Sequence, residues 1–128
     1  MERLEACRVL VVDDQRVVRQ YLQFVLQRAG YDVVLAADGE QGIQALEASG
    51  VDLVLTDLKM PGMDGFDVLR YVRQSSRPVP VVLMTAYGSP EMAEEARRLG
   101  AFAYLAKPFE FESLRQILRQ ALVGEPVV

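Results

Sequence analysis

Apolar runs and amphipathic segments alternate five times along this chain, and that alternation restricts the fold more than any other feature of the sequence. The runs with the length and β-branched content of strands are 9–12, 33–35, 53–55, 79–84 (interrupted by Pro80) and the shorter 103–105. Between and after them, apolar residues recur every three or four positions over 18–29, 43–46, 66–72, 91–99 and 111–122, as on one face of a helix. Strands that alternate with helices predict a parallel sheet with right-handed crossovers.

The strand runs are apolar at every position, which is typical of a sheet covered by helices on both faces. A length of 128 residues with 51% hydrophobic residues suits one domain with its own core. We therefore predict a single doubly wound α/β domain over residues 1–122, with a flavodoxin-like five-stranded parallel sheet of order 2-1-3-4-5. Residues 123–128 are expected to be a tail or the start of a linker to an output module. The helix over 91–99 has few large apolar residues and is expected to be weakly anchored.

Composition excludes several classes of function. The chain has no histidine, which removes the commonest general base and the commonest zinc ligand. Its formal net charge of −4 argues against direct binding of nucleic acid. No apolar stretch approaches the roughly 20 residues of a membrane span, so no membrane contact is expected. The single cysteine, Cys7, allows no internal disulfide, and the expected compartment is a reducing cytoplasm.

Polar residues follow four of the predicted strands, each at the carboxyl end. Asp13 and Asp14 follow the first strand, Asp57 the third, Thr85 the fourth and Lys107 the fifth. In open doubly wound sheets the functional site lies beyond these ends, where the strand order reverses. With the order 2-1-3-4-5 the reversal falls between strands one and three. The order therefore predicts Asp13 and Asp57 side by side, with Thr85 and Lys107 further along the same edge.

This set of side chains suits phosphoryl transfer onto a carboxylate. Three carboxylates close together repel one another, so at least one pKa should rise unless a cation lies among them. Oxygen ligands without histidine or cysteine favour magnesium over zinc. Lys107 adds a fixed positive charge and Thr85 a hydroxyl donor. The expected nucleophile is Asp57, with the metal and Lys107 neutralising the phosphoryl oxygens.

Each residue also has an ordinary structural interpretation. Asp14 could cap the first helix, because aspartate is a preferred N-cap. Lys107 alone would usually be a solvated lysine, and Thr85 a hydroxyl bonded to nearby backbone. Asp64 before Gly65 is interpreted as the cap of the third helix and is left outside the site. For the other residues, the ordinary interpretations would all have to hold together at one edge of one sheet. Such a coincidence is rare, so a common functional site is favoured.

These motifs, taken together, resemble those of response-regulator receiver domains, the CheY-like family of two-component signalling. The resemblance covers residues 8–122. Its motifs are Asp13-Asp14, the segment 56–65 around Asp57 (Thr-Asp-Leu-Lys-Met-Pro-Gly-Met-Asp-Gly), Thr85-Ala86 and Lys107-Pro108-Phe109. Each motif alone is weak, but all of them in order at receiver spacing are highly specific.

The resemblance implies that Asp57 is the phosphoacceptor and receives its phosphoryl group from a sensor histidine kinase or a phosphotransfer protein. It implies a Mg²⁺ (or Mn²⁺) ion held by Asp14, Asp57 and the backbone carbonyl of Lys59. Asp13 would act on this ion through a bound water. The domain would assist its own phosphorylation and dephosphorylation without being a conventional enzyme.

The resemblance also implies how the signal leaves the site. Lys107 would pair with phosphoryl oxygens, and the backbone at Lys59 and Ala86 would bind the phosphate. Thr85 would move toward the phosphate, and the Tyr104 ring would follow it inward. The responding surface would be the fourth helix, fifth strand and fifth helix, which would control an output domain or partner protein, with a possible homodimer on activation. A cis peptide at Lys107-Pro108 is implied as well.

Two other functions remain as hypotheses. One is a magnesium-dependent phosphohydrolase of the haloacid-dehalogenase kind, which also uses an aspartate nucleophile on a parallel sheet. Such enzymes typically carry a second acid two residues after the nucleophile, where this chain has Lys59, and they need a substrate cap. The other is a receiver that serves only for docking. Such a domain would usually have lost an acid or the lysine, and this chain retains them all.

Overall fold

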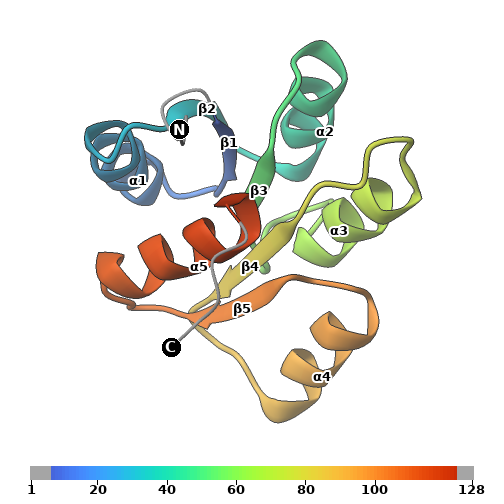
Figure 1. Cartoon of the computed structure of the whole chain (residues 1–128). Helices are drawn as coiled ribbons and strands as arrows, with labels where there is room; N and C mark the ends of the chain where they lie inside the picture. The colour runs from blue at the N-terminus through green and yellow to red at the C-terminus, as the bar shows by residue number, and fades with distance from the viewer. Residues whose placement is uncertain (1–6, 124–128) are drawn as a thin grey trace.

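Five strands alternate with five helices in the computed structural model, which describes residues 7–123 (Figure 1). The predicted tail, apart from its first residue, lies outside the described residues. The strands are β1 (Arg8–Val12), β2 (Asp32–Ala36), β3 (Leu53–Asp57), β4 (Val81–Thr85) and β5 (Ala103–Ala106). The helices are α1 (Arg16–Arg28), α2 (Gly39–Ala48), α3 (Gly65–Gln74), α4 (Pro90–Arg98) and α5 (Phe111–Val123).

The strands form one parallel sheet in the order β2-β1-β3-β4-β5, which confirms the predicted topology. The strand order reverses at β1, so the loop after β1 and the loop after β3 open side by side. The register pairs Val12 with Thr56 and Asp57 with Met84, which brings the carboxyl ends of the central strands to one edge.

Alternate strand residues fill two separate cores, one on each face of the sheet. Leu10, Val54 and Leu83 point to the face covered by α2, α3 and α4. Val11 and Leu55 point to the opposite face, which α1 and α5 cover. Figure 1 shows this division, with α1 and α5 on one side of the sheet and α2 and α3 on the other. The continuously apolar strand runs are explained by this two-sided burial.

The observed strand ends differ slightly from the predicted ones. β4 begins at Val81 rather than at residue 79, because Pro80 has no N–H to donate to a sheet ladder. The Pro80 carbonyl still accepts a bond of 2.9 Å from the Val54 N–H. At the carboxyl ends, Asp57 and Thr85 are the last residues of β3 and β4 rather than the first residues of the loops. Their side chains are therefore held by the sheet itself.

The helix ends agree with the predicted turn chemistry. Asp64 forms a capping box with Asp67 at the start of α3, as its position before Gly65 suggested. Ser89 caps α4, and Pro90 is the first residue of that helix. Only one residue of α4, Ala96, is fully buried, which agrees with the expected weak anchoring. No helix among residues 7–123 is both long and apolar enough to span a membrane.

Candidate functional site

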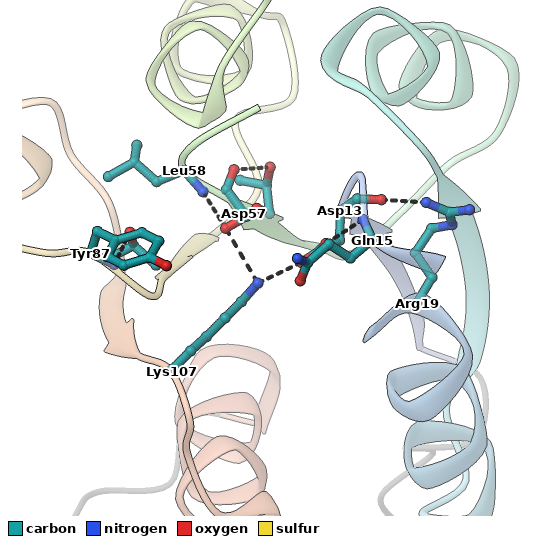
Figure 2. A network of polar contacts seen from close by, with 9 residues as sticks. Asp13, Gln15, Arg19, Asp57, Leu58, Tyr87 and Lys107 are labelled. Atoms are coloured by element: carbon teal, nitrogen blue, oxygen red, sulfur yellow. Dashed lines mark hydrogen bonds and ion pairs between the residues drawn. The ribbon is translucent and has the colours of Figure 1, made fainter. Parts of the chain in front are cut away.

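The carboxyl edge of the sheet brings the predicted polar side chains together, and Figure 2 shows Asp13, Asp57 and Lys107 among them. Asp13 follows β1 and is completely buried, while Asp14 beside it is exposed. Asp57 closes β3 and keeps 7% of its surface exposed. Thr85 closes β4 and is 1% exposed. Lys107 reaches the same point from the loop after β5.

The Lys107 ammonium is the cation at the centre of this cluster. Its Nζ lies 2.8 Å from Asp13 Oδ2 and 3.4 Å from Asp57 Oδ1. The side chain of Lys107 is only 15% exposed, so solvent screens both ion pairs weakly. The backbone N–H of Lys107 donates to the Thr85 carbonyl at 2.8 Å, which fixes the lysine beside the end of β4. The interpretation of Lys107 as a solvated lysine is therefore wrong.

The three acids gather within reach of one ion. Carboxylate oxygens of Asp13, Asp14 and Asp57 all lie within 4.8 Å of one another. Burial raises the pKa of Asp57 above its ordinary value, and the negative charges of Asp13 and Asp14 raise it further, while Lys107 lowers it. The predicted rise of one carboxyl pKa is thus present at Asp57. One ammonium does not fully offset three acids, and this oxygen-only donor set fits a divalent cation such as magnesium.

Asp13 is held by the first turn of α1. Its Oδ1 accepts the backbone N–H of Gln15 at 2.9 Å, and Arg19 donates to its carbonyl oxygen at 2.7 Å (Figure 2). The N-cap residue of α1 is Gln15, without a side-chain cap. Asp14 is therefore not the cap of this helix, and the capping hypothesis for it was wrong. The contacts of Gln15 and Arg19 were not predicted, because nothing in their spacing marks a tertiary contact.

The backbone around Asp57 is held by a close approach of α3. The Leu58 N–H donates to Asp57 Oδ1 at 3.1 Å. Gly65 opens α3 and donates to the Leu58 carbonyl at 2.9 Å. A Cβ at Gly65 would lie 2.5 Å from the Asp57 carbonyl oxygen, so only glycine fits against this strand end. The Asp-Gly pair predicted a helix start, but nothing local indicated its contact with Asp57.

The remaining predicted residues occupy the rim of the site and the neighbouring strand. Lys59 and Ala86 are exposed in the loops after β3 and β4. Thr85 Oγ1 accepts the Tyr87 N–H at 3.2 Å. Tyr104, on β5, is half-buried against the core under α4. Its hydroxyl makes no hydrogen bond to the acids or to any other described residue.

The peptide bond between Lys107 and Pro108 is cis, as the family resemblance implied. It lies directly after β5, at the residue that supplies the ammonium of the site.

Comparisons with known proteins agree on the family. The family model for the response regulator receiver domain matches residues 9–119. Sporulation initiation phosphotransferase F of Bacillus subtilis is 37% identical over 115 residues, which are 90% of this chain and 93% of the relative. Response regulator protein FleR of Pseudomonas aeruginosa is 38% identical over 120 residues, which are 94% of this chain. The chain spans only 25% of the length of FleR.

A solved structure shows the same fold. The chemotaxis protein CheY4 of Vibrio cholerae superposes with a TM-score of 0.85 at 36% identity, covering 91% of this chain and 98% of the other. The family match spans nearly all of the described residues, and the strand order is that of the predicted sheet. The chain belongs to the response regulator receiver domain family, the phosphorylation-dependent switches of two-component signalling.

Proposed function

We propose that this domain accepts a phosphoryl group on Asp57 from the phosphohistidine of a sensor histidine kinase or phosphotransfer protein. The observation that carries the proposal is the position of Asp57 beside Asp13, Asp14 and the Lys107 ammonium. An acid held by the end of a buried strand, next to a fixed cation, suits a nucleophile better than a structural ion pair.

The transfer exchanges one bond for another at phosphorus. An unprotonated oxygen of Asp57 attacks the phosphorus atom, the bond from phosphorus to the donor imidazole nitrogen breaks, and the electron pair leaves with the imidazole. Lys107 stabilises the negative charge on the phosphoryl oxygens, because its Nζ already lies 3.4 Å from Asp57. Backbone groups at Lys59 and Ala86, in the two exposed loops that flank the site, bind the remaining oxygens.

The same acids suit Mg²⁺ or Mn²⁺. Asp14, Asp57 and the Lys59 carbonyl would hold the ion directly, and Asp13 would act through a bound water. The bound ion would supply positive charge to the phosphoryl oxygens. Two observations support this assignment: the donors are all oxygen atoms, and the pKa of Asp57 is raised by burial and then by its acidic neighbours.

The switch passes from the site to the surface of α4, β5 and α5. Once Asp57 is phosphorylated, the Thr85 hydroxyl turns toward the phosphate and the Tyr104 ring adjusts behind it. The weak anchoring of α4, which fully buries only Ala96, supports a movable surface. This surface would control an output domain or a partner protein, or pair two copies as a homodimer.

The context of the domain in its protein is also part of the proposal. We infer a receiver over residues 1–122, with 123–128 as a tail or linker start. FleR and the transcriptional regulatory protein ZraR match only over about a quarter of their lengths, so an attached output module is one arrangement among the relatives. A reducing cytoplasm is the proposed compartment, since the donor kinases of two-component systems phosphorylate receivers there.

The two alternative functions are not favoured by the family match. A phosphohydrolase would turn over external phosphomonoesters, and a docking-only receiver would take up no phosphate. Labelling of Asp57 separates the receiver switch from a docking-only receiver, and turnover of an external phosphomonoester separates it from a phosphohydrolase. Incubation with acetyl phosphate and Mg²⁺ should add a single phosphoryl mass, seen by intact mass spectrometry. Asp57→Asn should abolish that mass. An unchanged mass in Asp57→Asn would falsify the assignment of the acceptor.

A further inference from the structure

The Tyr104 hydroxyl is a buried polar group without a hydrogen bond. Its oxygen is shielded from solvent and has no hydrogen-bond partner among the described residues. The ring packs against the core under α4, yet its polar end faces Gly88, in the loop between β4 and α4. Burying a hydroxyl without a partner costs free energy, which offsets part of the gain from packing the ring.

Gly88 leaves the space that this hydroxyl occupies. A Cβ built at Gly88 would lie 2.3 Å from the Tyr104 hydroxyl oxygen and 3.3 Å from Tyr104 Cζ. The same Cβ would lie 3.1 Å from Thr85 Cγ2. Gly88 therefore lies at the junction between the last residue of β4 and the ring on β5.

The need for glycine here is steric rather than conformational. Among the described residues, the glycines with positive φ are Gly30, Gly62 and Gly100, and Gly88 is not one of them. An alanine could adopt the same backbone at position 88. What it could not do is share the space with the phenol oxygen, because non-bonded atoms repel steeply below about 3 Å.

We propose that Gly88 is a positioning residue that permits the inner placement of Tyr104. Any side chain at position 88 displaces the hydroxyl, and the ring is the part that moves, because it is the far end of a side chain that can rotate about χ1. The loss is small in polar contacts, since the displaced hydroxyl gains water and gives up no hydrogen bond. The functional consequence rests on the proposed switch. A larger residue at position 88 would keep the Tyr104 ring outward whether or not Asp57 is phosphorylated.

Fluorine NMR of fluorotyrosine-labelled protein tests the placement without any phosphorylation. The chain has five tyrosines, and Tyr104→Phe identifies the resonance of Tyr104 by its disappearance. In metal-free wild type, this resonance should show the small water-to-deuterium-oxide shift of a buried ring. In Gly88→Ala it should move and acquire the larger solvent shift of an exposed ring. An unmoved, solvent-shielded resonance in Gly88→Ala would overturn the proposal.

Gly50→Ala is the matched control, since a Cβ at Gly50 would meet nothing within 4 Å. It should leave the Tyr104 resonance at the wild-type position. If it moves that resonance as far as Gly88→Ala does, the effect is not local and the proposal fails.

The thermal unfolding midpoint then locates the clash. Without the hydroxyl, the nearest ring atom to a Cβ at position 88 is Cζ, at 3.3 Å. Gly88→Ala should therefore lower the midpoint less in the Tyr104→Phe background than in wild type. An equal loss in both backgrounds would place the strain at Thr85 or the backbone and overturn the inference. Labelling of Asp57 by acetyl phosphate is a separate measurement. If wild type takes up no phosphoryl group, the proposed function is wrong, but the fluorine result still tests the role of Gly88.

Discussion

At the scale of single residues, the site is defined by an excess of acid that one lysine does not balance. Asp13 and Asp57 share the Lys107 ammonium, and Asp14 brings a third carboxylate within reach. The contact of Lys107 with Asp13 at 2.8 Å is shorter than its contact with Asp57 at 3.4 Å. The pKa of Asp57 is raised, mainly by burial and then by the charge of Asp13, and Lys107 offsets only part of this rise.

This imbalance makes Asp57 a source of instability in the metal-free protein at neutral pH. The folded pKa lies above the ordinary value of 3.8, so the folded state takes up a proton more readily than the unfolded chain. The contribution of Asp57 to the free energy of unfolding is therefore largest below pH 3.8. This contribution is lost as pH rises through the raised pKa of the folded state. Asp57→Asn should stabilise the metal-free protein at pH 7 by on the order of 1 kcal/mol.

Urea unfolding in the presence of a chelator measures this difference. The gain should shrink as pH falls through the raised pKa toward the ordinary one, because wild-type Asp57 then becomes neutral as well. Saturating Mg²⁺ should also narrow the gap, since it stabilises only the acid. A gain that is independent of pH would contradict the electrostatic origin.

At the scale of elements, α3 determines where the backbone of Asp57 lies. The capping box of Asp64 and Asp67 fixes the first turn of this helix, and Gly65 then touches the end of β3. Glycine is required at this contact because the neighbouring atoms belong to backbone, which cannot move without shifting the strand.

Gly65→Ala should therefore destabilise the fold by roughly 2 kcal/mol, as overpacking of a tight contact does. The Cβ would lie 2.5 Å from the Asp57 carbonyl oxygen and 2.9 Å from Leu58 Cα. The rate of phosphorylation by acetyl phosphate should fall as well, because Asp57 shifts away from Lys107. Urea unfolding and intact mass spectrometry measure the two effects. Gly50→Ala, in open space, serves as the control and should change neither of them.

At the scale of the whole molecule, the helices are unequally anchored to the sheet. α1 and α5 bury large leucines such as Leu22, Leu26, Leu114 and Leu118. α4 fully buries only Ala96, and β5 is an edge strand whose residues remain partly exposed. The α4 and β5 segment thus has less packing to lose than α1 or α5 when the site changes.

Amide hydrogen exchange should reveal this difference. In the unmodified protein, the amides of α4 should exchange faster than those of α1, because α1 buries Leu22 and Leu26 whereas α4 fully buries only Ala96. Saturation with beryllofluoride and Mg²⁺ should change exchange mainly between residues 85 and 106. Equal protection of α1 and α4, or a change spread evenly over all helices, would contradict the proposed output surface.

Most of the fold could be predicted because its signals are local. Apolar runs of strand length, the Ser89-Pro90 helix start and the Asp64-Gly65 cap depend on neighbours a few positions away. The start of β4 was placed too early, because the pattern counted apolar residues and gave too little weight to the missing N–H of Pro80. The strand ends bearing Asp13, Asp57, Thr85 and Lys107 could be placed at one edge once the order of a doubly wound sheet was assumed.

By itself, the sequence determined the alternation of elements, the polar residues available for chemistry and the edge of the sheet at which they meet. Only the tertiary structure decided that Lys107 pairs with Asp13, 94 positions away, more closely than with Asp57. It also decided that Gly65 touches the end of β3 and that Gly88 faces the Tyr104 hydroxyl. The physical reason is range: helix and strand signals act within one turn or one strand. These contacts depend instead on how separate loops pack across the sheet edge, and no local pattern encodes their distances.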